Sequence, residues 1–241
     1  MGRAFEVRKA SMLKTSNAKA KVYSRFGKEI YVAAKQGEPD PEMNSSLKKV
    51  IDRAKANNVP GDVIKRAIDK AKGSANESYT SAMYEGFGSN GAATILIECL
   101  TDNANRTIAD LRACFNKAKG KIGAAGSVSF NYQHVGNLVI NYSDEEKIME
   151  ALIEADVDLL DLEVEDGQMN INVDPQDLYK AKEAIETLIS DVVFEVLEPT
   201  MLPNEYIELE GDDKVLFDRL VTLLDDVDDV QNIYHNVSNL N

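Results

Sequence analysis

The sequence predicts an α+β fold, in which an N-terminal three-helix domain precedes two ferredoxin-like α/β domains and the middle domain is discontinuous. Three observations support this prediction. Apolar residues repeat with a helical period through the first third of the chain, strands alternate with helices beyond about residue 90, and the charge changes sign between the two ends. The expected domains are residues 1–73, residues 80–132 together with 204–238, and residues 133–203.

Charge is distributed very unevenly along the 241 residues, which carry 27 Lys and Arg against 41 Asp and Glu, a net charge of −14. Residues 1–72 contain 17 basic and 8 acidic side chains, residues 73–129 contain five of each, and residues 130–241 contain 5 basic and 28 acidic side chains. Because phosphates repel an acidic surface, the charge of the whole chain argues against nucleic acid as a partner. The basic first third is the exception, and there the charge favours a polyanion.

Three helices are expected in this basic third. The first spans about residues 16–35 and stops at Gln36-Gly37-Glu38-Pro39, where Gly and Pro follow its last turn. The second opens with Asp40 as its N-cap and Pro41 at its first position, and it ends at residues 57–58. The third lies between residues 60 and 73. About 60 residues of this pattern can form a small domain of their own.

A polar linker at residues 74–82 precedes the part of the chain in which strands and helices alternate. The expected elements are strand 93–99, helix 105–119, strands 126–132 and 136–141, helix 144–155, the hairpin of strands 160–164 and 168–173, helix 175–189, strand 194–197, strand 206–209, helix 214–224 and strand 230–234. Residues 136–198 thus have the βαββαβ order of a ferredoxin-like domain. The βαβ segments on either side each lack half a sheet, so we expect them to pair, with Pro199 and Pro203 marking a boundary.

Basic side chains form a stripe on the first helix. At 100° per residue, Lys21, Arg25, Lys28 and Lys35 share an arc of about 80°, beside the apolar face. Such a stripe favours nucleic acid, since neutralising phosphates releases counterions; the alternative is a solvated helix face. The other candidate binding residues are those of an N-terminal arm, Arg3, Arg8, Lys9 and Lys14, and those of the next two helices, Arg53, Lys55, Lys65 and Arg66.

Motifs for catalysis, cofactors and metals are weak. Gly86–Gly91 matches G-x-G-x-x-G but precedes a strand, the inverse of the dinucleotide-binding context, which indicates a glycine-rich turn feeding an edge strand. The acidic run at residues 225–229 lacks EF-hand spacing, so a solvated helix end is favoured over a divalent-ion site. Cys99 and Cys114 are expected to be buried thiols. We therefore expect that the protein binds no cofactor and no metal and is not an enzyme. The alternative is an enzyme with its active site in a cleft between the α/β domains.

Three stretches together resemble the YebC/PmpR family of transcriptional regulators, which includes a mitochondrial translational activator of cytochrome c oxidase. The first is Val32–Pro41 with Asn44, Leu47 and the run 54–60. The second is Tyr84–Gly88 with Glu98–Asn103, Asn105–Thr107 and 123–128, and the third is the run 228–236. The sequence departs from the family in two places. Its opening, MGRAFEVRKA, lacks a His-Ser-Lys-Trp start, as in a shorter subgroup, and Ser89-Asn90-Gly91 replaces Pro-Gly-Gly.

The resemblance implies a cytoplasmic protein without catalytic chemistry that binds DNA in transcriptional control. Its basic N-terminal helical domain would contact the phosphates, and the acidic α/β domains would serve protein partners. The alternative is a ribosome-associated translation factor or translational activator that binds RNA with the same surface, because structured RNA is recognised largely through shape and phosphates. With no apolar run of transmembrane length and no signal peptide, no membrane partner is expected.

Overall fold

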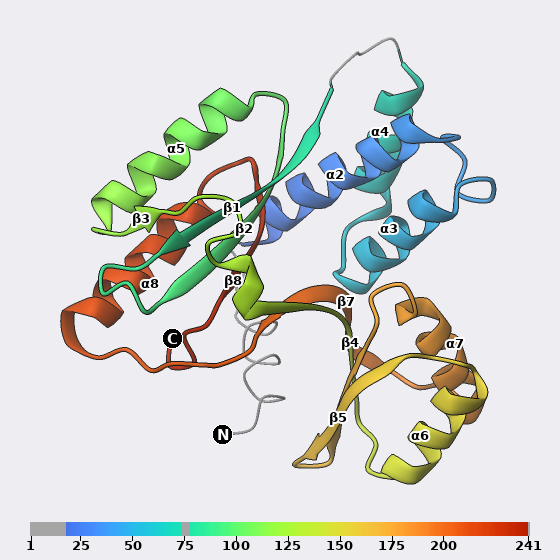
Figure 1. Ribbon diagram of the computed structural model, residues 1–241. Helices are drawn as coiled ribbons and strands as arrows, with labels where there is room; N and C mark the ends of the chain where they lie inside the picture. Colours follow the sequence, from blue (N-terminus) through green and yellow to red (C-terminus); the bar gives the residue numbers. More distant parts are fainter. Residues whose placement is uncertain (1–17, 74–77, 241) are drawn as a thin grey trace. The chain divides into compact units, whose positions relative to one another are not determined.

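The computed structural model describes residues 18–73 and 78–240, and for residues 18–20 it describes only the backbone (Figure 1). By their contacts, the described residues form two compact units, one of residues 131–205 and the other of residues 18–73, 78–130 and 206–240. The described part contains seven α-helices and two four-stranded antiparallel sheets. This confirms the predicted α+β class. None of the described helices combines the length and apolar character that crossing a bilayer requires.

The larger unit begins with the helices α2 (Ala18–Gln36), α3 (Ser45–Ala56) and α4 (Gly61–Lys72). They enclose an apolar core in which Ile30, Leu47 and Ala54 are fully buried. The predicted N-cap of the second helix, Asp40, is wrong. Asn44 caps α3 instead, because its side chain accepts a hydrogen bond from the Leu47 N–H while its amide donates to the carbonyls of Ala33 and Glu38.

The same unit contains a sheet of strands β1 (Thr80–Phe87), β2 (Thr94–Thr101), β3 (Lys121–Ile122) and β8 (Val230–His235), in the order β3-β1-β2-β8. This is the order of a βαββαβ domain whose third strand comes first in the sequence. Helices α5 (Ala104–Lys117) and α8 (Gly211–Asp225) contribute Leu111, Phe115, Phe217 and Leu220 to its core.

Three expected elements of this region differ from the structure. Residues 80–82 are not linker but begin β1, which pairs along its whole length with β2. No strand forms over residues 126–131, because the backbone N–H groups of Gly126, Val128 and Ser129 donate to the Glu85 carboxylate and are unavailable to a ladder. Within residues 206–209 only Ile207 forms a bridge, a parallel one to Val237.

The smaller unit has the predicted βαββαβ order. Its elements are β4 (Tyr132–Ile140), α6 (Glu145–Glu154), β5 (Leu159–Glu165), β6 (Gln168–Val173), α7 (Leu178–Leu188) and β7 (Phe194–Pro203). The sheet order is β5-β6-β4-β7, as in ferredoxin-like domains. β7 is longer than expected and includes Pro199 and Pro203, which an edge strand tolerates because one side of it needs no N–H donors. The domain boundaries remain a prediction.

Candidate nucleic-acid interface

The cationic stripe of α2 contacts the acidic segment, defined here as residues 225–229, within the larger unit. Lys21 Nζ lies 3.1 Å from Asp225 Oδ2 and also pairs with Asp226. Arg25 Nη2 lies 2.6 Å from Asp225 Oδ1 and also donates to the Asp225 carbonyl. The acidic segment is therefore not a simple solvated helix end, because Asp225 and Asp226 pair with Lys21 and Arg25 of α2.

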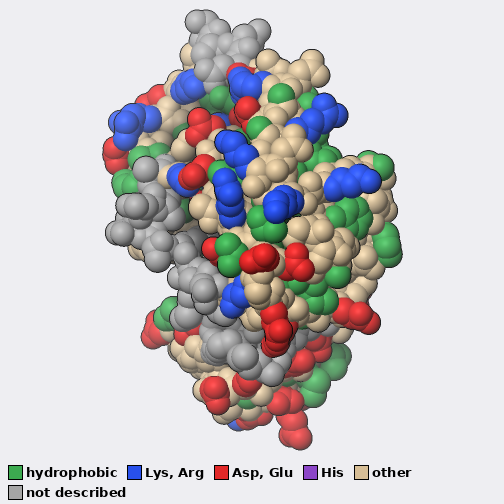
Figure 2. All heavy atoms as spheres, turned by 90° about the vertical axis from the view of Figure 1, so that its left-hand side faces the viewer, with side chains coloured by type: hydrophobic (Ala, Val, Ile, Leu, Met, Phe, Trp, Pro, Cys, Tyr) green, Lys and Arg blue, Asp and Glu red, His purple; other side chains and the backbone are tan. Residues whose placement is uncertain are grey.

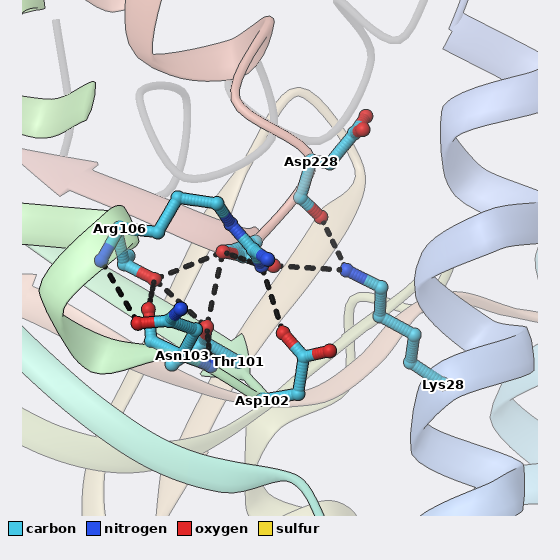
Figure 3. Close-up of polar contacts among 8 residues, drawn as sticks. Lys28, Thr101, Asp102, Asn103, Arg106 and Asp228 are labelled. Atoms are coloured by element: carbon cyan, nitrogen blue, oxygen red, sulfur yellow. Dashed lines mark hydrogen bonds and ion pairs between the residues drawn. The ribbon is translucent and has the colours of Figure 1, made fainter. Parts of the chain in front are cut away.

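Lys28 continues these contacts toward the end of the segment. Its Nζ donates to the backbone carbonyl of Asp228 at 2.7 Å and lies 3.3 Å from Asp229 Oδ1. Figure 3 shows the Lys28 side chain reaching from α2 toward Asp228. Three of the four stripe residues are thus engaged by residues about 200 positions away in the sequence.

The pKa values in this contact reflect the pairing. Burial raises the pKa of Asp225, but the hydrogen bonds and charges of Arg25 and Lys21 outweigh it and leave that pKa below its ordinary value. The hydrogen bond from Lys21 to Asp226 raises the pKa of the lysine, against a smaller opposing effect of burial. Both shifts favour the charged forms, so the contact is ionic at neutral pH.

Asp229 is the centre of a buried polar cluster at this contact. Figure 3 shows Thr101 and Arg106 of this cluster. Its Oδ2 accepts hydrogen bonds from Thr101 Oγ1 at 3.0 Å, from Thr107 Oγ1 at 2.9 Å and from Arg106 Nη2 at 2.9 Å. Only 5% of the Asp229 side chain is exposed. Burial raises the pKa of Asp229. A larger combined effect in the opposite direction comes from the hydrogen bonds of Arg106, Thr107 and Thr101 and from the charge of Lys28, so the pKa of Asp229 is below its ordinary value.

Sequence reasoning missed the structural role of this cluster, although all its residues lie in the stretches that carry the family resemblance. Thr101, Arg106 and Thr107 come from β2 and the start of α5, and Asp229 precedes β8. Asn103 caps α5 by accepting from the Arg106 N–H, which directs the first turn of the helix toward the cluster. The available signal was the co-occurrence of these short polar motifs beside predicted strand ends.

The remaining predicted binding residues lie in different surroundings. Lys35 donates to the Ala71 carbonyl at 3.4 Å. Arg53 pairs with Glu29 at 3.3 Å, and Arg66 pairs with Asp62 one turn earlier on α4. Lys55 and Lys65 are exposed and make no ion pair with any described side chain. Arg3, Arg8, Lys9 and Lys14 lie outside the described residues.

Helices α3 and α4 hold the exposed basic charge of the helical region. Residues 45–72 contain eight basic and three acidic side chains. Lys48 and Lys55 lie seven residues apart on α3, and Lys65 and Lys72 have the same spacing on α4, so each pair shares one side of its helix. All four are exposed and form no ion pair within the described chain. The predicted stripe on α2 is mostly paired, whereas these lysines remain available to a polyanion.

The glycine-rich run serves packing and turning. A Cβ on Gly86 would lie 2.4 Å from the Phe115 ring, and one on Gly88 would lie 2.9 Å from the Phe217 ring. These glycines therefore let α5 and α8 approach the sheet. The following strand, β2, is an interior strand of the sheet, so the expectation of an edge strand is wrong.

A cleft of about 680 Å³ adjoins the Asp229 cluster. Its lining includes Arg106, Lys117, Asp110 and Cys114. Cys114 and Cys99 are free and buried, as predicted, and burial raises the pKa of both thiols, that of Cys99 to about 12. Within residues 18–73 and 78–240, no group of His, Cys, Asp and Glu has an arrangement that could hold a metal ion.

Comparison with known proteins covers nearly the whole chain. The family model described as the TACO1/YebC protein N-terminal domain matches residues 3–74, and the model described as the TACO1/YebC second and third domain matches residues 79–237. Proteins named probable transcriptional regulatory proteins are similar to it: one from Pseudoalteromonas translucida is 50% identical over 237 residues, and one from Chromohalobacter salexigens is 50% identical over 236 residues. Each alignment covers 98% of both chains.

A solved structure shows the same fold. The crystal structure of a conserved hypothetical protein from Aquifex aeolicus superimposes with a TM-score of 0.74 and 29% sequence identity. The match covers 94% of this chain and 91% of the other.

Proposed function

Because the chain belongs to the TACO1/YebC family, whose similar bacterial members are named probable transcriptional regulatory proteins, we propose that it regulates transcription by binding DNA. The basic helical region, helices α2 to α4, contacts the phosphates of the DNA backbone. Because this function requires access to the DNA, the proposed location of the protein is the cytoplasm. Its function is binding, without a catalytic step.

The observation that carries the proposal is the exposed, unpaired charge of α3 and α4. Lys55 and Lys65 were expected to contact phosphate, and Lys48 and Lys72 extend the same helix sides. Lysines in such positions neutralise phosphates and release counterions, which is the main source of affinity in sequence-independent DNA binding. The α2 stripe contributes less to the free protein's field, because three of its four charges face carboxylates or carbonyls of the acidic segment.

The acidic side chains fit a complementary role. Residues 130–241 carry 28 of the 41 acidic residues and only five basic ones. Their charge repels nucleic acid and restricts phosphate contact to other parts of the chain. It also provides a surface for a basic protein partner.

The proposal is tested by fluorescence anisotropy with a labelled DNA duplex and a labelled RNA hairpin of equal charge. We expect the wild-type protein to bind duplex DNA with an affinity that falls steeply as salt rises from about 50 to about 200 mM. The variant Lys55→Gln/Lys65→Gln should bind more weakly and show a slope smaller by about 1.8, because about 0.9 is lost per phosphate contact.

The matched control is Lys147→Gln/Lys180→Gln, which removes the same charge from the smaller unit. These lysines pair with Asp144 and Asp156. Equal weakening by both double variants would reduce the effect to net charge and contradict the assignment to α3 and α4. Binding of the RNA hairpin in clear preference to the duplex would favour the alternative, a ribosome-associated factor that uses the same surface.

A further inference from the structure

A second group of basic side chains lies outside the helical region, on the second half of α5 and on the segment that leads from it into β3. We name Arg112, Lys117, Lys119 and Lys121 the α5–β3 basic patch. Figure 2, which faces the side where α5, β3 and α8 lie in Figure 1, shows several Lys and Arg side chains on this side, with Asp and Glu side chains among them. The sequence around the patch is nearly free of acids: residues 103–143 contain five basic residues and one acidic residue, Asp110, in a chain with 41 acids in 241 residues.

The four side chains are exposed and form no ion pair with any carboxylate of the described chain. The fifth basic residue of the stretch, Arg106, differs, since it pairs with Asp102 and Asp229. This contrast separates a structural arginine at the start of α5 from accessible charges at its end. Lys117 lies in the last turn of α5, where its charge stabilises the helix by interacting with the helix dipole. This stabilisation explains the presence of Lys117 but not that of the other three basic residues.

Lys119 occupies a backbone position that normally belongs to glycine. After the C-cap Ala118, the Lys119 N–H donates to the Asn116 carbonyl and the Gly120 N–H donates to the Phe115 carbonyl, which together form a Schellman motif. In this motif the residue after the cap adopts a left-handed conformation, and Lys119 has φ of 56°. Glycine adopts it without steric cost, whereas a lysine Cβ approaches the following carbonyl.

Lys119 is unusual even among the left-handed residues of this protein. The other described non-glycine residues with positive φ are Asn58, Asp156, Asp166 and Asp191. Asn and Asp tolerate this conformation because their short polar side chains bond locally to the backbone, and lysine has no such compensation. A lysine here lowers local stability relative to glycine, which indicates that its charge serves something other than folding.

The surroundings of the patch indicate which kind of partner it fits. Protein interfaces have a core of large apolar or aromatic side chains. The large hydrophobic residues exposed in the described chain include Met83 and Phe130 but none between residues 104 and 122. Between residues 104 and 122 the exposed side chains are Lys, Arg, Asn and Ala with one acid, Asp110, and such a surface without an apolar centre fits a phosphate backbone. Lys117 also borders the cleft lined by Asp110, Asp226 and Asp228.

We propose that the α5–β3 basic patch is a second contact surface for the DNA backbone, in addition to α3 and α4. The inference rests on the proposed function, because it assigns a further binding site for the same ligand. The contact is made through phosphates and carries no base recognition. It therefore predicts a contribution to affinity and salt dependence that is equal for different DNA sequences.

The experiment uses the full chain, the labelled duplex and two sets of variants. Lys119→Gly removes one charge and places glycine, which adopts the left-handed backbone conformation without steric cost, at this position. We therefore expect the thermal midpoint to stay the same or rise while DNA affinity falls several-fold. Lys117→Gln/Lys121→Gln should reduce the salt slope by about 1.8. Asn58→Gly is the matched control for backbone relief, since Asn58 has φ of 58° and no charge. Lys119→Arg should retain binding.

The outcomes separate the inference from the proposed function. If the patch variants bind duplex as the wild type does while Lys55→Gln/Lys65→Gln binds weakly, the inference is wrong and the proposed function stands. If the wild-type protein binds no DNA, both are wrong. If the patch variants lose affinity for labelled polyglutamate as strongly as for DNA, the patch is a site for acidic proteins and the inference is overturned.

Discussion

The Arg25 guanidinium lies 2.6 Å from Asp225 Oδ1 and 3.3 Å from the Asp225 backbone carbonyl, although 200 residues separate the two in sequence. Arg25 belongs to the stripe that the sequence marks for phosphate, and Asp225 is the last residue of α8. Arg25 thus makes to a carboxylate of the same chain the charge-assisted hydrogen bond that a free arginine offers to phosphate. This relationship joins the basic and acidic ends of the chain and limits which cations are free.

Removing the acidic partners should raise affinity for DNA. In Asp225→Asn/Asp226→Asn the carboxylates that face Lys21 and Arg25 are neutral, so both cations become available to phosphate. We expect tighter duplex binding and a larger salt slope by anisotropy. The control is Asp212→Asn/Asp218→Asn, which removes equal charge elsewhere on α8. Equal tightening by the control would attribute the effect to net charge alone.

The direct ion pair should contribute little to folding. The Arg25 side chain is 19% exposed and that of Asp225 is 41% exposed, so solvent screens the pair. A double-mutant cycle of Arg25→Ala and Asp225→Ala, measured by urea unfolding, should give a coupling free energy of about 0.5–1 kcal/mol. A coupling near zero would mean that the two side chains do not interact in solution.

Asp229 should matter far more for stability than its neighbour. Asp229→Ala removes the acceptor of the Thr101 hydroxyl and one acceptor of the Thr107 hydroxyl, and it breaks a buried ionic contact with Lys28, so we expect the free energy of unfolding to fall by about 3 kcal/mol. Asp228→Ala is the control. Lys28 bonds the Asp228 backbone carbonyl, which the substitution retains, so urea unfolding should change little. Similar losses for both variants would contradict the role of Asp229.

His235 should make stability depend on pH below neutrality. Burial lowers its pKa from 6.5 to about 4. The unfolded chain therefore binds a proton at higher pH than the folded one, so this contribution is complete above about pH 6.5 and is lost as pH falls toward 4. Thermal midpoints between these values should fall less in His235→Gln than in the wild type. Parallel curves would contradict the lowered pKa.

The helical region could be predicted largely because its information is local. The period that placed Ile30, Leu47 and Ala54 inward agrees with their complete burial. The N-cap assignment failed because Asp40 and Asn44 are equally good caps by residue type, and only the bonds from Asn44 to α2 distinguish them.

The missed strand and the missed charge pairing depend on distant residues. β1 contains polar residues and glycine, and it becomes a strand because β2 pairs with it and because Gly86 admits the Phe115 ring. Opposite charges at the two ends of the chain were evident from composition, but which carboxylate meets which cation depends on the folded position of α8. The left-handed backbone of Lys119, on which its proposed role rests, was also hidden, because it is a property of the structure.

Lysine footprinting tests the central claim, that DNA phosphates bind exposed lysines of the larger unit, most directly. The full chain is labelled with an amine-reactive reagent with and without duplex DNA, and each lysine is quantified by mass spectrometry. We expect DNA to protect Lys48, Lys55, Lys65 and Lys72 together with the lysines of the α5–β3 basic patch, and to leave Lys147, Lys180 and Lys182 unchanged. Uniform protection, or protection confined to the last three, would contradict the account.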